Sequence, residues 1–128
     1  MSYITLSRVG WVLSGLFALF IIFASALPKL AGMAVASDIM AQLGWPDAPL
    51  ALIGSLEAGL AILYLIPATS VLASALLMAL LGGALVTNLR GHADLFSHTL
   101  FGVYLGIWMW GALIARDPRV RAVFPLVR

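Results

Sequence analysis

The sequence contains no cysteine and few charged residues. Without cysteine the chain cannot form disulfides, carry out CxxC redox chemistry or bind a metal through thiolates. Asp, Glu, Lys and Arg make up 9% of the 128 residues, whereas about 25% is usual in a soluble domain. The basic residues form no stripe that could follow a phosphate backbone, so we expect no nucleic-acid partner. So few charges cannot cover a water-facing surface, and we expect a lipid bilayer to surround the chain.

The apolar residues, 63% of the chain, are concentrated in four long runs. A helix needs about 20 such residues to cross a bilayer core. Clusters of proline, glycine and polar residues separate the runs, and "PATS" (67–70) predicts a tight hairpin between the second and third. The expected spans are 9–27, 50–66, 71–89 and 96–115. The sequence therefore predicts an all-α fold, with residues 1–128 forming one domain, a four-helix transmembrane bundle.

Two segments allow a second interpretation. Residues 31–43 carry spaced apolar side chains around Asp38, which favours a short interfacial helix, with a plain loop as the alternative. Arg8, the first apolar run and "ASA" (24–26) imitate a secretory signal peptide. The run is long for the apolar region of a signal peptide, so we expect it to be a membrane span.

Four spans place both termini on the same side of the membrane. The basic residues on that side are Arg8, Arg116, Arg119, Arg121 and Arg128. The opposite side has Lys29 and Arg90. Because positive residues gather on the cytoplasmic side, we expect cytoplasmic termini in a cell inner (plasma) membrane. This orientation predicts an inner belt of aromatic residues: Trp11, Tyr64, Trp108 and Trp110.

Glu57 is the only acidic residue within the expected spans. Lys29 follows the first span, Asn88 ends the third and His98 begins the fourth, so all four residues lie toward the outer side. An unpaired charge at mid-membrane costs about 2.5–3.5 kcal/mol on insertion scales. Glu57 must therefore be protonated, paired or hydrated, with Lys29 and His98 as its natural partners. The sequence predicts a small polar pocket that opens outward.

Helical spacing places these residues on faces suited to the bundle interior. His98, Gly102 and Gly106 are four residues apart and share one stripe, and small residues permit close packing of membrane helices. Glu57 shares its face with Gly54. The GxxxG pair on the fourth span would serve a homodimer as readily as the bundle itself.

The predicted pocket suits a lipid-soluble quinone. Lys29 and His98 could donate hydrogen bonds to a quinone oxygen, and Glu57 could carry protons. These three residues are the catalytic candidates, and together with Asn88 they are the ligand-binding candidates. No metal site is expected, because the His and Glu residues lack a ligand-pair spacing such as HExxH.

Three functions remain open at this point. The first is a membrane subunit of a quinone-linked redox system. The second is a non-catalytic scaffold that binds membrane or redox subunits, in which Lys29 and Glu57 only join two helices. The third is a carrier of small solutes or lipids. Whether the chain is an enzyme is left undecided.

Several stretches are familiar in their order and spacing: "GWVLSGLFALF" and "ALPKL" (10–30), "LGWP" (43–46), "LIGSLEAGLAILYLIPAT" (52–69), "GGALVTNLRG" (82–91), "LFSHTLFGVYLG" (95–106) and "RDPRVRAVFP" (116–125). Through them the chain resembles the DoxX-like family of small four-helix membrane proteins over nearly its whole length. The resemblance implies the four-span fold and places Lys29 and Glu57 at the family's characteristic Lys and Glu. DoxX-type relatives are linked to thiosulfate:quinone oxidoreductase subunits and to membrane complexes for oxidative-stress defence.

One position departs from the family pattern. Asn88 stands where many similar sequences have a His after Thr, which argues against a metal or acid–base role at that position. The absence of cysteine argues against this chain carrying sulfur as a persulfide.

Overall fold

A computed structural model describes residues 2–127, and among them every regular element is a helix. The first long helix, α1 (Tyr3–Phe20), continues through a π-helical segment, η1 (Ile21–Ala26), into the short α2 (Leu27–Leu30). The remaining elements are α3 (Ala34–Gln42), α4 (Leu50–Leu65), α5 (Ser70–Arg90), η2 (Leu95–Thr99, also π-helical), α6 (Phe101–Arg116) and α7 (Pro118–Val123).

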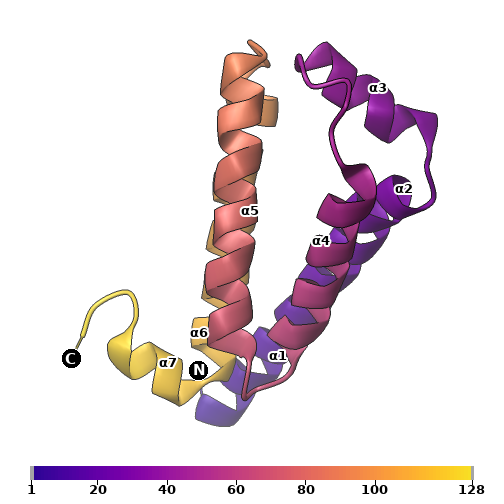
Figure 1. Cartoon of the computed structure of the whole chain (residues 1–128). Coiled ribbons are helices and arrows are strands. Elements are labelled where there is room, and N and C mark those ends of the chain that lie inside the picture. Colours follow the sequence, from indigo (N-terminus) through magenta and orange to yellow (C-terminus); the bar gives the residue numbers. More distant parts are fainter. Residues whose placement is uncertain (1, 128) are drawn as a thin grey trace.

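The long helices run alternately up and down (Figure 1). α1 packs against α6, α4 returns alongside η1 and α2, and a tight turn joins α4 to α5. The helices lie close together at the lower end of Figure 1 and diverge toward the upper end, where α3 lies across the top of α4. Both chain ends lie at the lower end, where the Ser7 hydroxyl of α1 donates to the Arg116 carbonyl of α6 at 3.3 Å.

Three helical stretches are long and apolar enough to cross a membrane: Tyr3–Leu30, Ser70–Arg90 and Leu95–Arg116. α4 is equally apolar but has only 16 residues, about 24 Å at the usual rise per residue. Large apolar side chains face outward from these helices, among them Phe23, Ile62, Leu72 and Ile107, each more than half exposed. The chain is therefore an all-helical membrane protein whose outer surface suits lipid.

The helix boundaries differ from the expected ones where local geometry intervenes. The first helix continues past Pro28 to Leu30, although proline usually ends a helix by clashing with the carbonyl one turn earlier. The π-helical turn η1 immediately precedes Pro28, and such turns occur as bulges inside longer helices. The segment for which a helix and a loop were both open is helical at Ala34–Gln42, while its place in the membrane interface stays a prediction.

The core lies in the lower half of the bundle. It is built around the fully buried side chains of Phe17, Tyr64, Leu77, Met109 and Leu113. At Gly10, a Cβ atom would lie 2.8 Å from backbone atoms of α6, so only glycine lets α1 and α6 approach this closely.

Tyr64 corrects one sequence expectation. It was expected in an aromatic belt, but its side chain is fully buried. Its hydroxyl donates to the Met109 carbonyl at 2.7 Å and lies 3.3 Å from the Ser14 hydroxyl. Because a buried tyrosine needs a partner for its hydroxyl, these contacts fix the ring in the interior and connect α1, α4 and α6.

Candidate functional site

Glu57 of α4 pairs with Lys29 of α2, as the sequence predicts. The Lys29 ammonium lies 3.2 Å from each carboxylate oxygen of Glu57. The Ser25 hydroxyl donates to Glu57 at 3.0 Å, and Lys29 also donates to the Ser25 hydroxyl and carbonyl at 2.9 and 3.1 Å. The Lys29 and Glu57 side chains are 15% and 16% exposed. We call Ser25, Lys29 and Glu57 the polar triad.

The backbone of α4 comes unusually close to the first helix beside the polar triad. Gly54 lies one turn before Glu57, and a Cβ atom on it would lie 3.0 Å from the Ala26 carbonyl oxygen and 3.1 Å from the Cβ of Lys29. A larger residue would therefore push the helices apart. Gly54 and Glu57 share one face of α4, as the sequence predicts. The close approach at Gly54 brings the Glu57 carboxylate within reach of the Lys29 ammonium.

The polar triad lies in the wall of a pocket of about 540 Å³ between the diverging helices. Most of the remaining lining is apolar, contributed by all the helical elements except η2 and α7. Representative apolar lining residues are Phe20, Ile39, Ile53, Leu80 and Leu105. Pockets of about 300–1,000 Å³ with apolar walls and a few placed polar groups are typical small-molecule sites.

α3 forms one wall of this pocket and is joined to the bundle by two short connections, each with a glycine at positive φ. Gly32 and Gly44 flank it with φ values of +66° and +84°, a region that favours glycine. Beyond its C-terminal end, Leu43 packs against Gly91, where a Cβ atom would lie 2.8 Å from the Leu43 Cδ2 atom. α3 is therefore a cover for the pocket, and Leu43 and Gly91 close its contact with α5.

Asn88 also lines the pocket, but from α5. Its side-chain NH₂ group donates to the Ala84 carbonyl at 2.8 Å, so the amide is held by its own helix. Thr87, likewise in the lining, donates its hydroxyl to Gly83 at 2.8 Å. Because an amide has more donors and acceptors than this one bond uses, Asn88 retains capacity to bind a ligand.

His98 lies apart from the other candidate residues. Its side chain is exposed, its Nδ1 atom lies 2.7 Å from the Ser97 hydroxyl, and it is not part of the pocket lining. The reason is the π-helical turn η2, which breaks the regular spacing that would have aligned His98 with Gly102. Thr99, the next residue, is buried instead. The structure therefore brings Lys29, Glu57 and Asn88 to one pocket and leaves His98 outside it.

Asp94, another acidic residue at this end, serves local structure. Asp94 accepts hydrogen bonds from the hydroxyl and backbone N–H of Ser97, at the start of η2. These bonds hold the pKa of the Asp94 carboxyl below its usual value. Within residues 2–127, no three His, Asp or Glu side chains are grouped closely enough to hold a metal ion.

Comparison with known proteins gives one match. The model of the DoxX-like family matches residues 12–112, most of the chain. The chain belongs to the DoxX-like family. No curated protein and no solved structure gives a significant match to it. The matched range of this DoxX-like protein includes Ser25, Lys29, Glu57 and Asn88.

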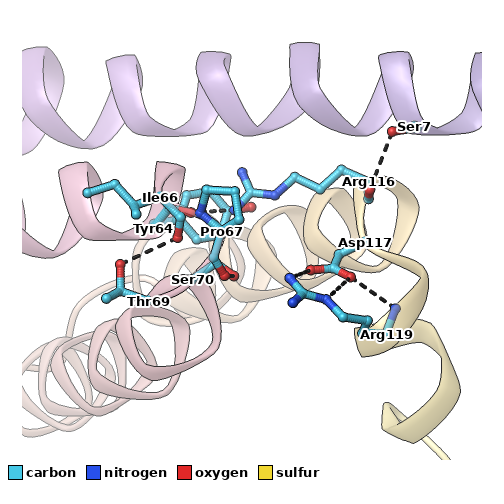
Figure 2. Close-up of polar contacts among 9 residues, drawn as sticks. All are labelled: Ser7, Tyr64, Ile66, Pro67, Thr69, Ser70, Arg116, Asp117 and Arg119. Atoms are coloured by element: carbon cyan, nitrogen blue, oxygen red, sulfur yellow. Dashed lines mark hydrogen bonds and ion pairs between the residues drawn. The ribbon is translucent and has the colours of Figure 1, made fainter.

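Two features of the DoxX-like protein were missed from sequence. Ser25 completes the polar triad, and its spacing four residues before Lys29 was the available signal. Arg116 was counted only as a cytoplasmic charge, yet it is 5% exposed. Its guanidinium donates to the Tyr64 carbonyl (Figure 2). The guanidinium also lies 4.3 Å from the Trp11 ring centre. Nothing in the local sequence distinguishes it from Arg119, which is exposed, or from the half-buried Arg121.

Proposed function

We propose that this DoxX-like protein binds the polar headgroup of a lipid-soluble small molecule, and that a quinone is the chemical class that fits best. The observation that supports this is the joining of the polar triad and Asn88 in one apolar pocket of about 540 Å³. The apolar lining suits a ring or an isoprenoid chain, and the polar groups suit carbonyl oxygens.

The polar triad offers both kinds of group that a quinone headgroup needs. The Lys29 ammonium is a donor, and a quinone oxygen could replace one of its present contacts with Ser25. Glu57 is an acceptor that can carry protons between the pocket and its mouth. In a quinone-linked redox system the protein would supply this headgroup site, and a partner subunit would supply the electrons.

Membrane topology is part of the same proposal. α4 runs back along the first helix and leads directly into α5 (Figure 1), which supports its being a fourth, short span. With four spans and the arginine-rich ends together, the positive-inside rule supports cytoplasmic termini. The pocket then lies toward the outer side of a cell inner membrane.

A second candidate is a scaffold without a small ligand. It is favoured by the hydrogen bonds within the polar triad, which already satisfy the Lys29 ammonium and tie α2 to α4. In that case the pocket would bind nothing specifically, and partner subunits would contact the apolar outer faces of the helices.

Quinone binding separates the two candidates. Trp45 lines the pocket, and a bound quinone is expected to quench its fluorescence. The protein in detergent would be titrated with a short-chain quinone, and Trp45→Phe would verify the origin of the signal. Lys29→Met is expected to weaken binding at least tenfold, since hydrogen bonds to charged groups contribute about 1.5–3 kcal/mol.

Arg90→Gln is the matched control. It removes one positive charge from the same end of the molecule, but Arg90 lies outside the pocket lining. Equal quinone affinity in the Lys29→Met and Arg90→Gln proteins, with both folded, would rule out the headgroup site. Recovery of quinone from the purified wild-type protein by mass spectrometry would support it independently.

A further inference from the structure

A second pocket, of about 490 Å³, lies at the opposite end of the molecule from the polar triad. It is shallow and is formed where the first turns of α1 meet the junction of α6 and α7. Besides Arg116, the residues lining it are Tyr3, Ile4, Ser7, Arg8, Pro118 and Arg121. None of these residues is acidic, so the pocket carries only positive charge. Arg8 and Arg121 both fall outside the range that matches the family model.

Two of the arginines are placed to bind an anion. Arg121 is oriented by α6, since its guanidinium donates to the Ile114 and Ala115 carbonyls at 3.2 and 2.8 Å. The fork of the guanidinium has further N–H groups for another acceptor. Arg8 is exposed, and its side chain forms no hydrogen bond or ion pair with any residue from 2 to 127.

The neighbouring arginines are committed elsewhere. Arg119 forms an ion pair with Asp117 at 2.8 Å. The side chain of Arg116 runs away from Ser7 toward Tyr64 (Figure 2), and its guanidinium lies 4.7 Å from the Tyr64 ring centre. Arg116 therefore lines the pocket with its backbone and not with its guanidinium. The positive charges available to bind an anion are those of Arg8 and Arg121.

The face of α1 above this pocket suits an acyl chain. Ile4, Val12 and Leu19 are 68%, 62% and 53% exposed, and helical spacing places them with Arg8 on one side of α1. A pair of arginines at the end of an apolar helix face matches a molecule with an anionic head and a hydrocarbon tail. Basic pockets at the cytoplasmic ends of membrane helices bind such lipids.

We infer that this pocket binds the phosphate of an anionic phospholipid, held by Arg8 and Arg121, with an acyl chain along α1. Arg121 provides the fixed donor, because its orientation is set by the end of α6. Arg8 provides the second donor, because its exposed guanidinium has no partner among residues 2–127. The site is separate from the polar triad and does not depend on quinone binding there, although its place at the cytoplasmic end rests on the proposed topology.

Native mass spectrometry of the delipidated protein tests the inference. The protein in detergent would be titrated with phosphatidylglycerol and, separately, with phosphatidylcholine. Phosphatidylglycerol is expected to bind at least tenfold more tightly. Arg8→Gln is expected to weaken its binding about fivefold, the loss typical of one basic side chain near an anionic membrane. Arg119→Gln removes the same charge from the same end and is expected to leave binding unchanged.

Three further results are decisive. Arg121→Gln removes the bonds to α6, so Arg121→Lys serves as a second variant if the glutamine protein does not fold, and its binding should also be weaker. Equal losses of phosphatidylglycerol affinity in Arg8→Gln and Arg119→Gln would show that only the overall charge matters. That result would overturn the proposed site. Inorganic phosphate that displaces the lipid at equal concentration would identify a free-phosphate site and overturn the lipid assignment.

Discussion

The pairing of Lys29 with Glu57 predicts a strongly coupled double-mutant cycle. At 3.2 Å, the attraction between the two charges is about 5 kcal/mol at an effective dielectric constant of about 20. Removing both charges from water offsets most of this gain, so the intact pair adds little net stability. Removing one partner leaves the other charge without compensation, which costs about 3–5 kcal/mol when the site is fully buried.

The expected cost is slightly lower in this structure, because both side chains retain about 15% exposure in the pocket wall. We expect Lys29→Met to lower the free energy of unfolding by about 2–4 kcal/mol. Glu57→Leu should cost less, since Lys29 can turn toward the membrane surface. The double variant should lie within about 1 kcal/mol of the wild type, giving a coupling energy of about 2–3 kcal/mol.

The free energy of unfolding of the wild type, the two single variants and the double variant can be measured in mixed micelles with increasing amounts of a denaturing detergent. The exposed pair of Asp117 and Arg119 provides the matched control cycle, because the Arg119 side chain is 74% exposed and its coupling should stay below about 1 kcal/mol. Additive losses from Lys29→Met and Glu57→Leu would refute the reasoning. Restored stability without restored quinone binding would show that the same residues serve both structure and ligand.

Three other changes have expected outcomes. Gly10→Ala should destabilise the protein by about 2 kcal/mol or more in the same unfolding assay, because its new Cβ atom meets the backbone of α6 and the helices must separate. Tyr64→Phe should cost about 1–3 kcal/mol there, because it leaves the buried Met109 carbonyl without that donor. The hydroxyl and the backbone N–H of Ser97 both donate to Asp94 and lower the pKa of that carboxyl, so their stabilising effect is present above the ordinary value of about 3.9 and is lost as pH falls through the lowered one. Amide exchange at Ser97 should therefore be protected above that ordinary value and lose protection as pH falls below it, and Asp94→Asn should abolish this dependence.

The pairing of Lys29 and Glu57 could be predicted because a charge in an apolar run must find a partner, and few candidates exist. The position of His98 could not be predicted, because it depends on a π-helical turn. No residue pattern in the sequence identifies that turn. Arg116 shows a further limit. Its burial depends on the approach of α1 and α6, which are far apart in the sequence. Local composition alone predicts that an arginine beside Asp117 lies at the membrane surface. The membrane spans can be predicted from composition, whereas the direction in which a single side chain points depends on local helix geometry.

The two halves of the bundle have different physical roles. In the lower half, a close approach at Gly10 and the bonds of Tyr64 create a tightly packed interior. In the upper half the helices diverge, and the space between them holds polar groups that add little net stability. A protein can carry such a pocket only if its stability comes from elsewhere in the chain. Changes to the polar triad that keep its charge balance should therefore alter ligand affinity more than folding, and changes around Gly10 should do the reverse.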